Sequence, residues 1–258
     1  MRNLKSILIA ALLMVAVDAQ AQQVVANRGS HSAKGVEENT LAALRAAESE
    51  AIGVVLCDVN MTEDGAIVVV QGPWLGDKND PDRLNIQRSD LATLRSKQLA
   101  NGECVPTLEE YLTEVATMPT MRLIINIREH ATPQAETEVV RKVVAAVKSH
   151  KLQANVEYSS SRQHVCSELV RLAPSNSVVL YYGSNLTPQY IQGLGYAGFG
   201  YSVDALKRVP RWIDEARRLG LKVDVRGVNS AEDAAWAVQQ GAERIVTDNP
   251  SLIKRYIK

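Results

Sequence analysis

Asp58 and Gln71 are the residues whose types and spacing first point to a site. Each stands in an apolar run rich in β-branched residues, and the two runs flank Asp64-Gly65. An Asp-Gly pair between such runs indicates a tight hairpin, because Gly accepts the positive φ that the turn requires. Folding about a two-residue turn would place Asp58 opposite Gln71. Since side chains alternate faces along a strand, Leu56 should share the face of Asp58 while Cys57 points the other way. We therefore expect a carboxylate, an amide and a leucine at one place.

Three arginines, Arg28, Arg128 and Arg226, could form an anion site. A guanidinium group binds phosphate or carboxylate through two hydrogen bonds and does not lose its charge. If all three side chains point inward, they would hold an anion without a metal ion. The alternative is a structural role, in which Arg28 pairs with Glu38 or Asp248, Arg128 pairs with Asp58, and Arg226 points to solvent.

Short apolar runs alternate with helical patterns along the chain from Val24 onward. The runs predict strands at 24–28, 53–59, 67–71, 122–127, 155–158, 177–182, 197–202, 221–226 and 243–247. The patterns predict helices at about 39–51, 107–116, 134–149, 162–172, 187–193, 210–219, 230–240 and 250–256. This alternation implies parallel strands joined by helical crossovers, and about eight units imply a closed barrel. We expect an α/β fold, a TIM-type (β/α)8 barrel with a β-hairpin irregularity after the second strand. The polar excursion at 72–103 should form a loop with a short helix at 89–95.

Barrels of this class carry their chemistry at the carboxyl ends of the strands. Eight polar, charged or aromatic residues are predicted near such ends: Asn27, Asp58, Asn126, Arg128, Glu157, Tyr181, Tyr201 and Arg226. Their placement predicts a polar pocket at one mouth of the barrel.

Length and composition favour one large domain. The chain has 258 residues, is 46% hydrophobic and has a formal net charge of zero. No basic run with interleaved aromatic residues appears, and polyanion binding needs clustered Lys and Arg. We therefore expect no nucleic-acid partner.

Residues 1–21 have the features of a secretory signal peptide. Arg2 and Lys5 precede an apolar run, and Ala19-Gln20-Ala21 forms a small-x-small cleavage site. The apolar run is shorter than the roughly 20 residues that span a membrane, although a retained anchor is the alternative. We expect a secreted or periplasmic protein with no membrane span after signal removal, whose barrel domain occupies 22–258.

The three cysteines, Cys57, Cys104 and Cys166, resemble no metal site in their spacing. In an oxidising compartment two of them could pair, which would leave one over. The alternative is that they are small buried hydrophobic residues.

A series of short motifs, in order, resembles the glycerophosphodiester phosphodiesterase family. The family pattern reads His-Arg-Gly, Glu-Asn-Thr, Glu-x-Asp-Val, Thr-x-Asp-Gly and Val-Val-x-His-Asp. The corresponding stretches here are Asn27-Arg28-Gly29, Glu38-Asn39-Thr40, Leu56-Cys57-Asp58-Val59, Thr62-Glu63-Asp64-Gly65 and the run that ends at Gln71-Gly72. The resemblance continues through Leu123 to Arg128, Val225 to Asn229 and Ile245 to Pro250, and so covers nearly the whole mature chain.

The chain departs from the family pattern at the residues that carry the chemistry. The two catalytic histidines of the family fall on Asn27 and Gln71, and its metal-binding glutamates fall on Leu56 and Asn126. Asp58 is retained. The family lysine falls on Arg128, and the family tryptophan falls on Arg226; Glu38 stands where the family keeps a glutamate near the metal.

These departures imply weakened catalysis. Hard cations such as Ca²⁺ or Mg²⁺ need several oxygen ligands, and neither Asn nor Gln can transfer a proton near neutral pH. We expect no cofactor, or at most a weak divalent metal. His31 and His130, in loops after the first and fourth family strands, are the candidates for a relocated acid or base; otherwise they are ordinary loop residues.

Three functional hypotheses follow. The first is a family member without ordinary metal-dependent hydrolysis that binds a small anionic or phosphodiester ligand through Arg28, Arg128, Asn27 and Gln71. The second is an active phosphoric diester hydrolase that acts on glycerophosphodiesters in lipid metabolism with altered catalytic residues. The third is a barrel scaffold for protein–protein interaction whose working surface is 72–103.

Overall fold

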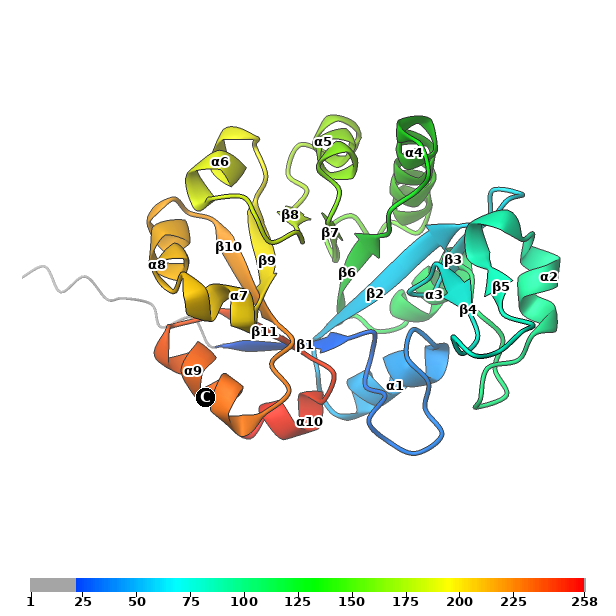
Figure 1. Cartoon of the computed structure of the whole chain (residues 1–258), viewed down its shortest axis with the longest axis horizontal. Helices are drawn as coiled ribbons and strands as arrows, with labels where there is room; N and C mark the ends of the chain where they lie inside the picture. Colours follow the sequence, from blue (N-terminus) through cyan, green and yellow to red (C-terminus); the bar gives the residue numbers. More distant parts are fainter. Residues whose placement is uncertain (1–21, 258) are drawn as a thin grey trace, which may run out of the picture.

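The computed structural model describes residues 22–257. The predicted signal peptide at 1–21 lies outside this range. Parallel strands form a closed barrel with helices around its outside (Figure 1). The barrel strands are β1 (Gln23–Asn27), β2 (Val54–Met61), β6 (Arg122–Ile127), β7 (Val156–Ser160), β8 (Val179–Tyr181), β9 (Gly198–Ser202), β10 (Lys222–Arg226) and β11 (Arg244–Thr247). The ring closes because β1 pairs with β11 on one side and with β2 on the other.

Helices follow most strands, as the alternating pattern predicts. They are α1 (Leu41–Ser49), α3 (Leu108–Val115), α4 (Pro133–Ser149), α5 (Gln163–Leu172), α6 (Pro188–Gly193), α7 (Val203–Arg208), α8 (Arg211–Arg218), α9 (Ala231–Gln239) and α10 (Pro250–Ile253). The helix missing from the prediction is α7, a short helix that begins directly after β9, with the Ser202 hydroxyl accepting from the Ala205 N–H as its N-cap. None of the described helices is long and apolar enough to cross a membrane.

The hairpin after β2 has a register that differs from the prediction. Thr62 and Ala66 close a three-residue loop through a 2.9 Å backbone hydrogen bond, and Gly65 takes a φ of 82°. This extra residue shifts the pairing by one, so that the Val70 N–H donates to the carbonyl of Asp58 at 2.9 Å. Asp58 therefore lies opposite Val70. Gln71 follows the end of β3 (Ile67–Val69) and is exposed.

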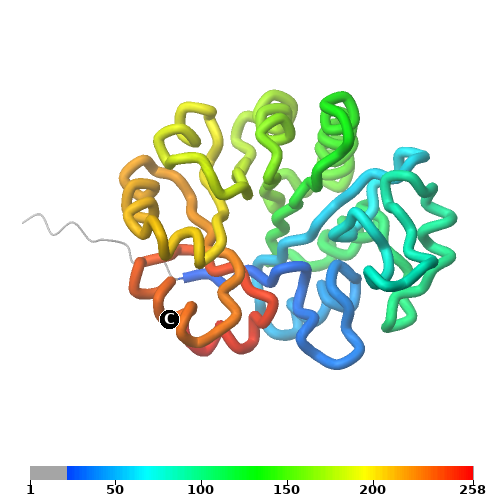
Figure 2. The backbone as a smooth tube through the Cα atoms, viewed as in Figure 1, coloured from blue at the N-terminus to red at the C-terminus, as the bar shows by residue number. Residues whose placement is uncertain are grey.

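The excursion at 72–103 extends to one side of the barrel beside β3 (Figure 2). It contains the two-stranded sheet β4 (Trp74–Leu75) and β5 (Leu84–Asn85), the 3-10 turn η1 (Ile86–Arg88) and α2 (Leu91–Ser96). The helix α2 confirms the short helix predicted at 89–95. The excursion has an apolar core of its own, in which Leu75, Ile86 and Leu94 are buried.

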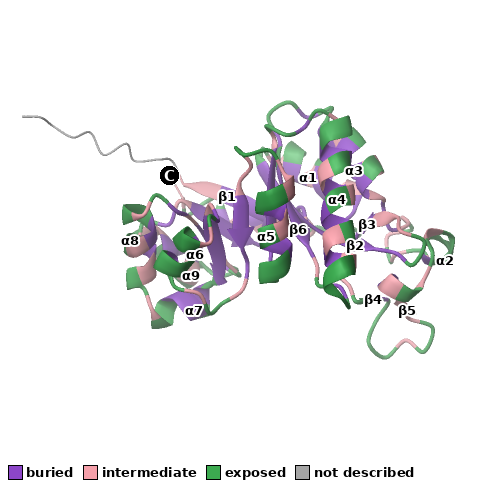
Figure 3. Ribbon diagram, turned by 90° about the horizontal axis from the view of Figure 1, so that it is seen from above, coloured by how far each residue is buried: buried purple, intermediate pink, exposed green. Residues whose placement is uncertain are grey.

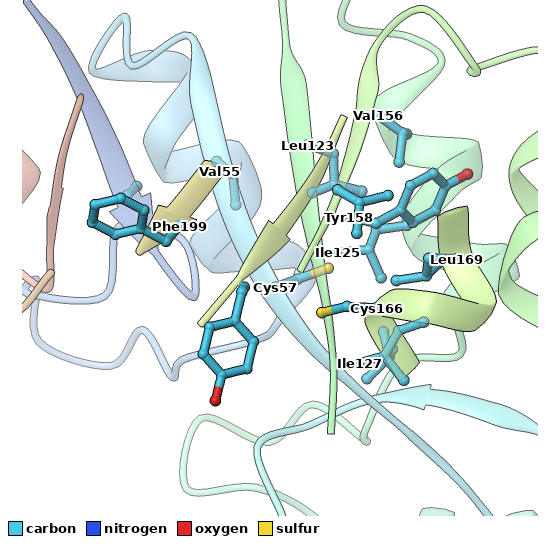
Figure 4. Close-up of a cluster of buried hydrophobic side chains, with 14 of the residues drawn as sticks. Val55, Cys57, Leu123, Ile125, Ile127, Val156, Tyr158, Cys166, Leu169 and Phe199 are labelled. Atoms are coloured by element: carbon cyan, nitrogen blue, oxygen red, sulfur yellow. The ribbon is translucent and has the colours of Figure 1, made fainter. Parts of the chain in front are cut away.

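Successive side chains along each barrel strand point alternately outward and inward, which produces two separate apolar clusters. Outward-facing side chains pack beneath the helices, so the strands are buried while the outer helix faces are exposed (Figure 3). Cys57 and Cys166 both belong to this outer layer (Figure 4). Inward-facing side chains form a smaller cluster inside the barrel, made of Val25, Val54, Leu56, Ile124, Leu180, Tyr182 and Val246.

The cysteines are all free. Cys57 and Cys166 are fully buried, and burial raises the pKa of both thiols, that of Cys166 to about 12. These two thus behave as small hydrophobic residues. Cys104 is only partly buried.

Charged residues fill the amino-terminal end of the barrel interior, where the prediction placed none. Glu157 is the second residue of β7, which begins and ends later than predicted, so it lies at this end and not at the mouth. Its carboxylate pairs with Arg244 and with Lys222, and Arg244 also binds Asp224. Burial would raise the pKa of Glu157, but Arg244 and Lys222 outweigh it and lower the pKa. This closed network leaves Glu157 no role in the mouth pocket.

Candidate functional site

The loop after β1 holds Arg28 in a conformation that is uncommon for residues other than glycine. Arg28 has a φ of 62°, and its backbone N–H donates to the carbonyl of Leu56 at 2.6 Å. Gly29 follows with a φ of 84°, where an added Cβ would lie 2.6 Å from the Cβ of Ala43. Only glycine fits so close to α1, so the loop folds back over the mouth of the barrel and carries the Arg28 side chain inward.

The Arg28 guanidinium group is neutralised by carboxylates of the protein. It lies 2.5 Å from Glu38 and 3.0 Å from Asp248, with 16% of its side chain exposed. Burial alone would lower the pKa of Arg28, but Glu38, Asp248 and Asp58 outweigh it and raise the pKa. Asn27 donates to the same Asp248 oxygen at 2.7 Å. The structural alternative for Arg28 named Glu38 or Asp248 as its partner; Arg28 pairs with both, which favours the structural role.

Asp58 is the retained carboxylate, and it faces into the barrel as predicted. It is 4% exposed, and its Oδ1 accepts a hydrogen bond of 2.6 Å from Nδ2 of Asn126. The amide oxygen of Asn126 in turn accepts from the Ser159 hydroxyl at 3.2 Å. The guanidinium of Arg128 lies 3.5 Å from the same Asp58 oxygen. Asp58 therefore has a neutral donor and an internal cation as partners.

A divalent cation does not fit this set of residues. Leu56 points into the apolar barrel interior beside Ile124 and offers no ligand, and the oxygen of Asn126 is already an acceptor within the protein. Across residues 22–257, no group of three or more His, Cys, Asp or Glu side chains is arranged to hold a metal ion. Hard cations require several oxygen ligands at once, and Asp58 alone does not supply them.

The two candidate histidines, His31 and His130, differ in their surroundings. His130 is 5% exposed; its Nε2 accepts from the Met61 N–H at 3.1 Å, and its Nδ1 lies 2.9 Å from the Arg128 carbonyl. Because a carbonyl only accepts, Nδ1 carries the proton and the ring is neutral. Both nitrogens bind backbone groups, so His130 is neither a free loop residue nor available for proton transfer. His31 lies beside the mouth, with Nε2 3.8 Å from Asp248 and without a hydrogen-bond partner among the described residues.

Arg128 differs from Arg28 because its hydrogen-bonding capacity is unused. Its side chain is 35% exposed and donates no hydrogen bond to any residue in 22–257. It lines a pocket of about 390 Å³ between the mouth of the barrel and the excursion. The other lining residues are Asn60, Gln71, Gly72, Pro73, Gln87, Glu129, His130, Ala131 and Arg162. Sequence reasoning foresaw Arg128, Gln71 and His130 here but missed Asn60, Gln87 and Arg162.

Arg226 and the strand-end tyrosines do not form part of this pocket. Arg226 stacks on the ring of Tyr182, with its guanidinium carbon 4.5 Å from the ring centroid. Tyr181 and Tyr201 belong to the layer beneath the helices. The solvent-facing alternative for Arg226 is thus wrong, because its guanidinium group stacks on Tyr182, which belongs to the cluster inside the barrel.

The comparisons with known proteins agree with the fold. Residues 27–252 match the model of the glycerophosphoryl diester phosphodiesterase family. The chain belongs to this family. A glycerophosphodiester phosphodiesterase of Caldanaerobacter subterraneus subsp. tengcongensis is 25% identical over 243 residues, which cover 91% of this chain and 97% of that protein.

Solved structures of family members share the same fold. A glycerophosphodiester phosphodiesterase from Parabacteroides distasonis is 30% identical, has a TM-score of 0.85 and covers 92% of this chain and 96% of its own. An Oleispira antarctica phosphodiesterase, solved in complex with the product sn-glycerol-3-phosphate, has a TM-score of 0.79 at 22% identity and covers 92% of this chain and 96% of its own. Asn27, Leu56, Gln71 and Asn126, which the sequence motifs predict to be substituted, lie within the fold of the family.

Proposed function

We propose that this chain binds a small phosphate-containing ligand at the mouth of the barrel and has lost the ordinary metal-dependent hydrolysis of its family. The observation that carries the proposal is that Arg128 lines the pocket with a guanidinium group that donates no hydrogen bond to any residue in 22–257. A guanidinium in this state binds phosphate through two charge-assisted hydrogen bonds. Gln71, whose side chain makes no hydrogen bond within 22–257, adds a neutral donor and acceptor in the same pocket.

The loss of hydrolysis is supported by the residues at the positions of the family histidines. Asn27 donates to Asp248, and Gln71 is an exposed amide. Neither can give or take a proton near neutral pH, and acid and base steps are each commonly worth about 10²- to 10⁴-fold in rate. The poor fit of Asp58, Leu56 and Asn126 to a divalent cation removes the other source of catalysis.

The nature of the ligand is inferred from the family. Family relatives act on glycerophosphodiesters by name, and the Oleispira antarctica protein was solved with sn-glycerol-3-phosphate. Glycerol 3-phosphate is therefore the natural first probe for this chain. Arg28 contributes less to ligand binding, because Glu38 and Asp248 already neutralise its charge.

The proposal is tested by thermal shift and by turnover on the same mature protein. A ligand that binds only the folded state stabilises it by RT ln(1 + [L]/Kd) and so raises the melting temperature. We expect glycerol 3-phosphate to raise it in the presence of EDTA, Ca²⁺ and Mg²⁺ to leave it unchanged, and glycerophosphodiesters to remain intact with either metal. A metal-dependent shift together with hydrolysis would contradict the proposal.

One observation favours a second candidate, a hydrolase with altered residues. His31 lies 3.8 Å from Asp248, and its Nε2 has no hydrogen-bond partner among the described residues. A carboxylate beside an imidazole is a usual arrangement for proton transfer. If hydrolysis is detected, His31→Asn should abolish it whereas His164→Asn, at an exposed site on α5, should not.

A further inference from the structure

Asn60 begins a chain of oriented amides beside the pocket. Its Nδ2 donates to the carbonyls of Val70 at 2.9 Å and Gln71 at 3.2 Å. Carbonyls can only accept, so the orientation of the Asn60 amide is determined by these bonds. Its oxygen must then point the other way, and there it accepts from Nε2 of Gln87 at 3.1 Å.

Gln87 is oriented by the same reasoning. Its Nε2 makes a second donation, of 2.7 Å, to the carbonyl of Glu129. Both amide hydrogens are thereby used, and both partners are acceptors, so the nitrogen and oxygen of Gln87 cannot be exchanged. The remaining polar atom, Oε1, has no donor among residues 22–257. Gln87 is half-buried and lines the pocket.

The pocket therefore offers two complementary features, a cationic donor at Arg128 and a fixed acceptor at Gln87. A simple alkyl phosphate dianion, which has no hydroxyl group to donate, would satisfy only the first. A buried or partly buried acceptor that a ligand leaves without a donor lowers affinity, which makes such an atom a source of selectivity.

We propose that Gln87 is a specificity-determining residue that selects, among phosphate esters, those that carry a hydroxyl group. The inference rests on the proposed phosphate binding at Arg128 and adds the residue that would recognise a hydroxyl group of the bound ester. It also assigns a function to the excursion at 72–103, since η1 brings Gln87 to the pocket. The amide chain through Asn60 ties that excursion to the end of β2.

The test compares glycerol 3-phosphate with n-propyl phosphate by calorimetric titration in EDTA. The two esters share the phosphate group and a three-carbon chain and differ in the hydroxyls. We expect the wild-type protein to bind glycerol 3-phosphate about 3- to 10-fold more tightly, the usual effect of one neutral hydrogen bond. Gln87→Met should abolish this ratio and leave the affinity for n-propyl phosphate unchanged. Gln189→Met, which replaces an exposed glutamine on α6, should keep the ratio.

The outcomes separate this inference from the proposed function. Equal affinity of the wild-type protein for both esters overturns the role of Gln87 and leaves phosphate binding intact. Binding of neither ester overturns both. The wild-type ratio is measurable even if Gln87→Met, which also loses the donations to Asn60 and Glu129, fails to fold. A ratio that persists in a folded Gln87→Met protein likewise contradicts the inference.

Discussion

Arg128 faces Asp58 across 3.5 Å at the mouth of the barrel; Arg128 directly follows β6, and Asp58 lies in the neighbouring strand β2. The carboxylate of Asp58 thus lies beside a cation of the protein itself. The ligand binding that we propose depends on Arg128.

Replacing Arg128 should weaken binding more than it weakens the fold. Arg128→Met removes a charged donor, so we expect the affinity for glycerol 3-phosphate to fall by about 10-fold or more. Because the pair with Asp58 is long and Arg128 is 35% exposed, the free energy of unfolding should change by less than about 1 kcal/mol. Calorimetric titration and urea denaturation measure the two effects. Arg211→Met, at a 76% exposed site, is the control and should alter neither.

Replacing Arg28 should weaken the fold more than it weakens ligand binding. Arg28→Met leaves Glu38 and Asp248 without their cation, and breaking such a partly buried pair costs roughly 2–4 kcal/mol. Urea denaturation should show this loss, while the folded fraction should retain most of its affinity for glycerol 3-phosphate. A stable variant with abolished binding would instead assign Arg28 to the ligand site.

Neutralising Asp58 should strengthen binding. Asp58→Asn removes a negative charge close to the proposed phosphate site while keeping an oxygen that can accept from Asn126. A charge about 4 Å away contributes about 1 kcal/mol in bulk water and more in a partly buried site, so affinity for glycerol 3-phosphate should rise by at least about 5-fold. Titration in EDTA measures it. Loss of binding would indicate that Asp58 acts through a metal ion.

His130 should make stability depend on pH. Its pKa lies below the ordinary value of 6.5 because burial outweighs the Arg128 carbonyl and Glu136. The unfolded chain therefore takes up a proton there at a higher pH than the folded protein, and stability should fall as pH drops from about 6.5 toward the folded pKa. Melting temperatures between about pH 7.5 and 5 should show a shallower slope for His130→Asn than for the wild type. His164→Asn should keep the wild-type slope.

Export is a further proposal from the sequence. We propose that residues 1–21 are removed after Ala21, so that the mature chain begins at Gln22. Intact-mass measurement of the protein recovered from the periplasm or medium should give the mass of 22–258. Recovery of the full-length mass in the membrane fraction would indicate a retained anchor.

Much of the fold could be predicted because the barrel depends on repeated local patterns. The alternation of strands and helices indicates the closed sheet. Leu56 and Asp58 are two positions apart in one strand, and this spacing correctly places both side chains inside the barrel. Thr107 and Glu110 form a full capping box at the predicted start of α3. Such features depend on neighbours in the chain, which a sequence displays directly.

Many contacts of the site join residues that are far apart in the sequence, and local sequence patterns do not predict such contacts. One added residue in the loop at Gly65 moved Gln71 out of register with Asp58. The bond from Gln87 to Glu129 joins residues 42 positions apart through an excursion with no regular repeat. Asn60 could have been found, since it lies two residues after Asp58 and alternation puts it on the same face.

Whether Arg128 binds phosphate without a metal ion is decided by titrating glycerol 3-phosphate into the mature protein, with EDTA present, in parallel for the wild type and Arg128→Met. We expect saturable binding to the wild type without any divalent metal and at least about 10-fold weaker binding to the variant. Binding that appears only when Ca²⁺ or Mg²⁺ is added would show instead that a metal ion, and not Arg128, holds the phosphate.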